Sequence, residues 1–206
     1  MSIVWSENSI AKFLDILASK QPTPGGGGAS ALVGAVAAAL GSMMANLTLG
    51  KPKFAAVEKE VMLLEGELQV ARAEFLKLVD EDAKAYNGVM ECYHLPKNGS
   101  QEQMLRRERL AKAAQFAAIV PLRIAEHCVK AAALTERVAQ IGNPALLTDA
   151  ACSVILAGAA LECAEQNVLI NLPLTHNESF NDDCRGKLKE YKEAVQKSKA
   201  KTIGVR

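Results

Sequence analysis

Asp82 is the residue whose setting in the sequence most favours acid–base chemistry. It occupies one position of a stripe that advances in steps of four and three residues along the segment 55–93, the period of a packed helix seam. The other members of the stripe are apolar or aromatic: Val57, Val61, Leu64, Leu68, Ala71, Phe75, Leu78, Tyr86, Val89 and Tyr93. A carboxyl group on such a seam loses hydration, which raises its pKa toward the range useful for proton transfer. An equally favoured alternative is a buried aspartate paired with a lysine or arginine of another helix. Asp80 and Glu81 fall off the stripe and are expected to be solvated.

A run of four glycines after two prolines, in the segment 22–28, is the second feature that could do chemistry. Glycine lets the backbone approach a ligand closely, and the helix expected after the run would offer free N–H groups to an anion. The chain has no nucleotide-binding P-loop, because Ala45 and Pro52 stand in the decisive positions around Gly50-Lys51. The alternative for the glycine run is a flexible loop that permits tight helix packing.

Other polar residues are weaker candidates. Asn167 and Asn171 are four residues apart, so on a helix they present two amides to the same face. Asp149 lies in the first turn of an expected helix, where ordinary dipole complementation is the favoured interpretation. Lys51 follows an uncharged segment and could meet an anionic substrate tail, although solvation is the default for a lysine.

The elements that must position these residues are helices. The chain has 206 residues, of which 50% are hydrophobic, 23% charged and only 4% aromatic, which favours a single all-α domain over residues 1–206. Breaks at proline and glycine predict helices over residues 6–19, 29–49, 55–93, 100–139 with a kink or break at Pro121, 144–172 and 181–198.

The segment 22–50 contains no charged residue and is long enough to span a bilayer. Its Ala, Gly and Ser content instead favours a fully enclosed helix in a bundle. The net charge of +1 disfavours a nucleic-acid partner, and the first eight residues lack a secretory leader. Five scattered cysteines indicate neither a disulfide framework nor a metal site. We therefore expect a cytoplasmic protein without a membrane span or a metal.

Several motifs, in order along nearly the whole chain, resemble the cyclodeaminase family. They are P-T-P-G-G-G-G-A at 22–29, N-L-T-L-G-K at 46–51, V-D-E-D-A at 79–83 with L-P-K at 95–97, G-N at 142–143 with T-D at 148–149, and N-V-L-I-N-L at 167–172. This family forms the C-terminal half of bifunctional formiminotransferase-cyclodeaminase and also occurs as free-standing proteins, including methenyltetrahydrofolate cyclohydrolases. The resemblance implies a helical bundle that forms a homodimer. It also implies a tetrahydrofolate substrate with one or several glutamates, no covalently bound cofactor, and Asp82 as the catalytic aspartate.

The implied reaction closes 5-formimidoyltetrahydrofolate to 5,10-methenyltetrahydrofolate with loss of ammonia. The folate N10 attacks the formimidoyl carbon, so the reaction needs proton transfer, assigned by hypothesis to Asp82, but no protein nucleophile. The residues expected to line the folate pocket are Pro24, Gly25, Gly26, Gly27, Lys51, Asn143, Asp149, Asn167 and Asn171. Hydrolysis of 5,10-methenyltetrahydrofolate to the 10-formyl form in the same pocket is an alternative that the sequence does not separate. A non-catalytic folate-binding or scaffold protein is the alternative from another class.

Overall fold

The computed structural model describes residues 4–204, and every regular element in this range is helical. The long helices are α2 (Gly26–Asn46), α3 (Glu58–Tyr93), α4 (Ser100–Ile141), α5 (Leu147–Leu169) and α7 (Glu178–Gly204). The short elements are α1 (Ile10–Leu17), α6 (Leu172–Thr175) and the 3₁₀ turns η1 (Trp5–Glu7), η2 (Pro52–Val57) and η3 (Pro144–Leu146). The predicted all-α helical bundle is confirmed.

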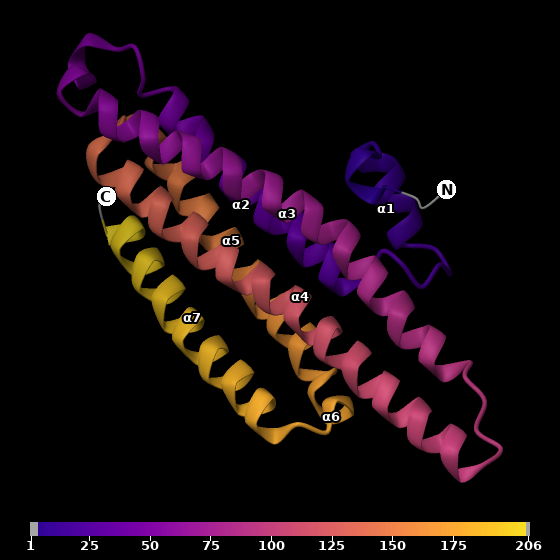
Figure 1. Ribbon diagram of the computed structural model, residues 1–206. Helices are drawn as coiled ribbons and strands as arrows, with labels where there is room; N and C mark the ends of the chain where they lie inside the picture. Colours follow the sequence, from indigo (N-terminus) through magenta and orange to yellow (C-terminus); the bar gives the residue numbers. More distant parts are fainter. Residues whose placement is uncertain (1–3, 205–206) are drawn as a thin grey trace.

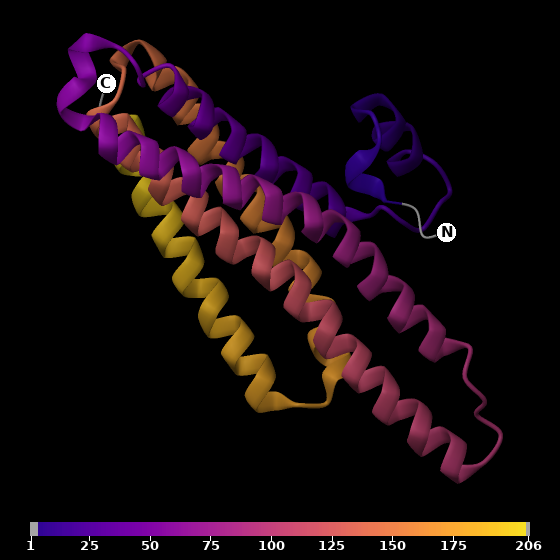
Figure 2. The same ribbon diagram turned by 45° about the horizontal axis from the view of Figure 1, so that its top comes forward.

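The five long helices form an elongated bundle in which successive helices run in opposite directions (Figures 1 and 2). The bundle therefore has two distinct ends. The first, here called the pocket end, holds the start of α2, the last turns of α3 and the end of α5. The far end holds the end of α2, the start of α5 and the C-terminus. The α3–α4 hairpin extends beyond the other helices at the pocket end, and α1 lies beside the bundle (Figure 1).

Helix α2 is the buried, small-residue helix that the uncharged segment predicted, and it packs against α3, α4 and α5. It is not fully enclosed, because Val36 and Met43 are exposed on its remaining face. The small residues spaced about one turn apart are all buried: Ala31, Ala35, Ala38 and Ser42. Two glycines bring the neighbouring helices still closer, because a Cβ atom at Gly34 would overlap the ring of Phe75, and one at Gly41 would crowd Thr135. Small side chains thus set the distance between α2 and its neighbours.

Two segments, Gly26–Asn46 and Pro144–Thr175, are long and apolar enough to cross a membrane by composition alone. In the most apolar window of α2, 61% of the residues are buried inside the bundle. Burial of this kind is also found in core helices of globular proteins, so the length of the apolar run is weak support for a span.

The helix boundaries differ from the predicted ones where tertiary contacts outweigh local preference. Helix α2 begins at Gly26 rather than at residue 29, so three of the four glycines form its first turn. Helix α4 runs without interruption from Ser100 to Ile141 although Pro121 lies inside it, so of the predicted kink or break the break is wrong. The expected first helix is divided into η1 and α1, and the last helix is longer at both ends than predicted.

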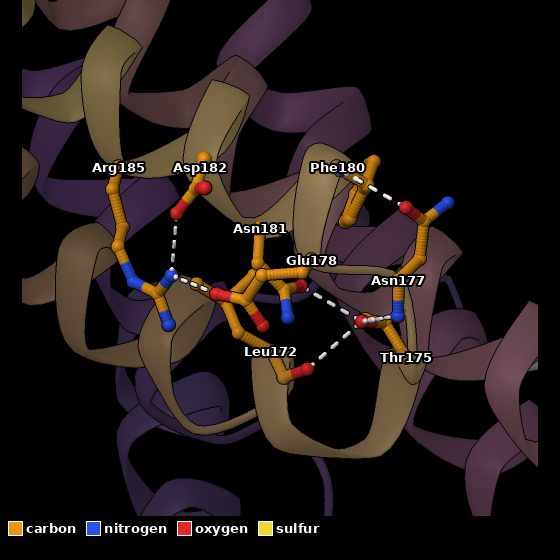
Figure 3. A network of polar contacts seen from close by, with 8 residues as sticks. All are labelled: Leu172, Thr175, Asn177, Glu178, Phe180, Asn181, Asp182 and Arg185. Carbon is orange, nitrogen blue, oxygen red and sulfur yellow. Dashed lines mark hydrogen bonds and ion pairs between the residues drawn. The ribbon is translucent and has the colours of Figure 1, made fainter.

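A polar network fixes the turn between α6 and α7 (Figure 3). The hydroxyl oxygen of Thr175 lies 2.9 Å from the carbonyl oxygen of Leu172 and 2.7 Å from Oδ1 of Asn181. The backbone N–H of Phe180 donates to Oδ1 of Asn177 at 3.1 Å, which caps the start of α7. These bonds hold the short helix that directly follows Asn171, and so they support one wall of the pocket end.

Candidate active site

A pocket of about 400 Å³ lies at the pocket end between α2, α3, α4 and α5. Its walls are formed by residues from the glycine run, the second half of α3, one residue of α4 and the end of α5: Pro22, Thr23, Gly25, Gly26, Gly27, Asp82, Ala85, Tyr86, Val89, Met90, Tyr93, Ala117, Asn167, Ile170 and Asn171. A hollow of similar volume between α3 and α4 contains none of the motif residues. Asp82, three glycines of the run and both asparagines are therefore brought together although they lie far apart in the sequence.

Asp82 stands at the N-terminus of α2. Its Oδ2 accepts a hydrogen bond of 2.9 Å from the backbone N–H of Gly28 in the first turn of that helix. Burial raises the pKa of the Asp82 carboxyl, and the bond from Gly28 opposes this rise only in part. None of the ion pairs among the described residues includes Asp82, which excludes the alternative of an aspartate paired with a lysine or arginine there. The carboxyl group is thus poised to exchange a proton with a bound ligand.

Gly27 makes room for this carboxyl group. A Cβ atom at position 27 would overlap Oδ1 of Asp82, and one at position 26 would lie 3.4 Å from the side-chain amide of Asn167. The glycine run is therefore neither a flexible loop nor a free anion site. It is a helix start whose N–H groups and missing side chains accommodate Asp82.

Asn167 and Asn171 present acceptors to the pocket. Nδ2 of Asn167 donates to the carbonyl oxygen of Cys163 at 2.8 Å, and Nδ2 of Asn171 donates to the carbonyl oxygens of Asn167 and Ala117 at 2.8 and 3.2 Å. Because a carbonyl oxygen can only accept, these bonds fix the orientation of both amides. The Oδ1 atoms are left free to accept hydrogen bonds, so the polar end of the pocket offers acceptors to a ligand that carries donors.

Asp80 and Glu81 are partly exposed, as expected for residues off the stripe, but each is bonded to another element, which the stripe did not predict. Asp80 accepts hydrogen bonds of 2.6 Å each from the backbone N–H of Trp5 and the hydroxyl of Ser6. Glu81 forms an ion pair with Arg123 of α4. Both carboxylates attach other elements to α3, and neither lines the pocket.

The remaining predicted site residues lie elsewhere. Lys51 is exposed beyond the end of α2, and Asp149 lies in the first turn of α5. Asn143 donates from its backbone N–H to Thr48 and caps η3 with its side chain. These three residues are at the far end of the bundle, so a single copy of the chain does not bring them to the pocket. Pro24 is buried beneath Gly28 and does not line the pocket.

The sequence singled out no ligand role for the apolar wall. Tyr86, Val89, Met90 and Tyr93 lie on successive turns of α3 after Asp82 and continue the pocket away from the glycine run. Three of them belong to the predicted stripe, and Tyr86 and Tyr93 remain exposed where a core residue would be covered. The signal that could have revealed this wall is an aromatic stripe that continues along the helix beyond the residues that pack against it.

Within residues 4–204, no group of three or more His, Cys, Asp or Glu side chains could hold a metal ion.

Comparison with known proteins agrees with the resemblance found in the motifs. The formiminotransferase-cyclodeaminase family model matches residues 9–190. A methenyltetrahydrofolate cyclohydrolase of Methylorubrum extorquens is 38% identical over 85% of this chain and 84% of its own length. The formimidoyltransferase-cyclodeaminase of Rattus norvegicus is 30% identical over 95% of this chain, which corresponds to 36% of the rat protein.

A solved structure gives the same result. The formiminotetrahydrofolate cyclodeaminase of Thermotoga maritima matches with a TM-score of 0.87 and 30% identity, covering 97% of this chain and 96% of that one. Sequence and fold thus agree over nearly the whole chain, and it belongs to the formiminotransferase-cyclodeaminase family of enzymes.

Proposed function

We propose that this protein closes 5-formimidoyltetrahydrofolate to 5,10-methenyltetrahydrofolate with release of ammonia. The observation that carries the proposal is Asp82, a carboxyl group of raised pKa without a cation partner, in a pocket large enough for part of a folate. The names of the T. maritima and R. norvegicus relatives support the same reaction.

The chemistry requires one group that takes up a proton and returns it. The folate N10 attacks the carbon of the N5-formimidoyl group, which enters protonated as an amidinium so that its nitrogen becomes a neutral NH2 group, and the N10 proton passes to the Asp82 carboxylate. The protonated carboxyl then donates to the departing nitrogen, so that the carbon–nitrogen bond breaks and ammonia leaves. General acid–base help of this kind accelerates a reaction by roughly 10²–10⁴-fold. Because the folate supplies the nucleophile, the reaction needs no covalently bound cofactor.

The acceptors of the pocket suit this substrate. A reduced pterin carries several N–H groups along one edge, and these complement the Oδ1 atoms of Asn167 and Asn171. Holding the pterin there would place its N5 atom, and the N10 atom of the adjoining bridge, toward Asp82. Fixed alignment of N10 with the formimidoyl carbon adds a positional contribution to the rate.

A second candidate reaction is favoured by the relative in M. extorquens, which is named a methenyltetrahydrofolate cyclohydrolase. Water would attack the methenyl carbon while Asp82 takes one of its protons. Cleavage of the bond to N5, with proton transfer to N5, would give 10-formyltetrahydrofolate and release one proton to solution. The same carboxyl group and the same pocket would serve both reactions.

We also propose that the protein acts in the cytoplasm as a homodimer. The described cysteines, all five of them free thiols, support a reducing compartment.

Turnover of each folate by the purified protein separates the two reactions. Ammonia released from 5-formimidoyltetrahydrofolate supports the cyclodeaminase, whereas loss of the methenyl chromophore without activity on the first substrate supports the cyclohydrolase. Activity on neither folate overturns both proposals.

Asp82→Asn should lower turnover at least 10²-fold while the fold and folate affinity are retained, as measured by kinetics, thermal melting and calorimetry. Asp80→Asn is the matched control, because it removes a carboxylate from the same stretch of α3 outside the pocket. It should lower the melting temperature and leave turnover unchanged. An Asp82→Asn protein with wild-type turnover would refute the role of Asp82.

A further inference from the structure

The pocket changes character along its length. Its polar end holds Asp82 and the two asparagines, and its other wall follows α3 through Tyr86 and Met90 to Tyr93. From position 82 to position 93 a helix advances by about 16 Å. The pocket is therefore a groove whose lining changes along its length. Hydrogen-bond acceptors line one end, and aromatic and apolar side chains line the part that runs toward the tip of the α3–α4 hairpin.

A basic hollow lies where this groove ends. It has a volume of about 350 Å³ and is lined by Lys97, Gln103, Arg106, Arg107 and Leu110, with no carboxylate among them. The guanidinium carbon of Arg106 lies 5.5 Å from the centre of the Tyr93 ring, which belongs to the groove. Arg106 thus connects the apolar wall with the hollow.

Arg106 is held ready for an anion. Its Nε donates to the carbonyl oxygen of Cys92 at 3.1 Å, and its side chain is half-buried against Tyr93. Its two terminal nitrogens have no partner within residues 4–204, whereas Arg123, Arg137 and Arg185 each pair with a carboxylate. The nearby Glu102 accepts from the backbone N–H of Asn98 instead. A fixed guanidinium with two unused nitrogens is the geometry that binds a carboxylate in bidentate fashion.

We propose that Lys97, Arg106 and Arg107 form a subsite for the glutamate carboxylates of the folate, an inference that depends on the function proposed above. A folate consists of a polar pterin, an apolar p-aminobenzoyl ring and a glutamate, in this order. The acceptors, the aromatic wall and the basic hollow follow one another in the same order. The subsite would orient the substrate, because a bound tail leaves the pterin only one direction in which to enter the pocket.

The test compares tetrahydrofolate with tetrahydropteroate, which lacks the glutamate, by calorimetry. The wild-type protein should bind tetrahydrofolate about 10- to 100-fold more tightly than tetrahydropteroate. Arg106→Gln should remove most of this preference without lowering the affinity for tetrahydropteroate. Arg109→Gln is the matched control, because Arg109 lies on the same helix but does not line the hollow. It should change neither affinity.

Kinetics add a second readout. With whichever derivative of the two compounds the purified protein turns over, the 5-formimidoyl or the methenyl form, Arg106→Gln should raise KM for the glutamylated substrate and leave kcat unchanged. Equal affinities of the wild-type protein for the two ligands, or an equal loss for both in Arg106→Gln, would overturn the subsite. Failure of the proposed function would be distinguishable, because it would appear as an absence of turnover. The ratio of the two affinities measured by calorimetry would still show whether the subsite exists.

Discussion

At the scale of single residues, two opposing effects act on Asp82. The N–H groups at the start of α2 favour the ionised carboxylate, whereas burial disfavours it. Burial is the larger effect, and the pKa is raised. The same carboxyl group therefore has a cost in stability beside the chemical use proposed for it.

This cost can be measured through its pH dependence. Because the pKa of Asp82 is raised in the folded state, the folded protein binds more protons than the unfolded chain between the ordinary value of 3.8 and the raised pKa. The free energy of unfolding must then fall as pH rises through this window, by about 1.4 kcal/mol for each pH unit that the window spans. Asp82→Asn keeps an acceptor for Gly28 but has no charge, so it should gain stability relative to wild type as pH rises. Urea unfolding of both proteins below and above the window checks this, and a constant difference would contradict it.

Gly27→Ala should displace the carboxyl group of Asp82, because the added methyl group would occupy its place. We expect turnover to fall by roughly 10²-fold and stability by ~1–3 kcal/mol. Gly66→Ala is the control for adding a methyl group to a helix. Gly66 is exposed on α3 with nothing near its missing side chain, so this change should stabilise the protein by ~1 kcal/mol and leave kcat unchanged. Kinetics and thermal melting test both variants, and an active Gly27→Ala enzyme would show that the site tolerates the methyl group.

At the scale of elements, Pro121 explains the orientation of Asn171. Proline has no N–H, so the carbonyl oxygen four residues earlier, that of Ala117, lacks its helical donor. The side chain of Asn171 supplies the missing hydrogen bond, which is how α4 continues through Pro121. The same bond turns the other end of the amide toward the pocket.

Pro121→Ala should therefore make the protein more stable and less active. The new N–H would bond to Ala117 in place of Asn171, raising the free energy of unfolding by ~1–3 kcal/mol. With one of its two acceptors taken, Asn171 is less firmly oriented, and kcat/KM should fall about 10-fold. In an Asn171→Ala background the same change should have no further effect on activity, which a double-mutant cycle measures. Equal losses in both backgrounds would exclude this coupling.

The sequence predicts elements better than their long-range partners. The stripe on α3 and the small residues of α2 identified the buried faces, because periodicity reflects local geometry. The start of α2 at Gly26 was missed, since glycine disfavours helix until the contact with Asp82, 54 residues away, is taken into account. The partners of Asp80 and Asn171, 75 and 54 residues away in sequence, were missed for the same reason.

At the scale of the whole molecule, the predicted site residues lie at two ends of the bundle. Helix α2 has 21 residues and so separates these ends by about 32 Å. Lys51, Asn143 and Asp149 therefore stay predictions, and within one copy of the chain they cannot contact a ligand that also contacts Asp82.

The outer face of α2 and α5 is the surface on which we expect two copies to meet. The two helices are joined where the Ser153 hydroxyl donates to the carbonyl oxygen of Ala37 at 2.8 Å. Beside this bond, Val36 and Ile155 are exposed by 46% and 44%, and the segment 22–50 offers no charge to water. If the wild-type protein is the proposed dimer, Ile155→Glu should convert it into a monomer in light scattering, because a carboxylate would be buried against apolar side chains. Leu63→Glu, at an exposed position on α3, should leave the dimer intact, and a dimeric Ile155→Glu protein would place the interface elsewhere.

The bonds that Asp80 makes to Trp5 and Ser6 bear on the fluorescence of the protein. Trp5 is the sole indole of the chain, it is buried, and its backbone is attached to α3 two residues before Asp82. Its fluorescence therefore comes from one known place, where η1 is attached to α3 at Asp80. Titration with folate, without any added label, should report movement of this part of α3 as a change in emission.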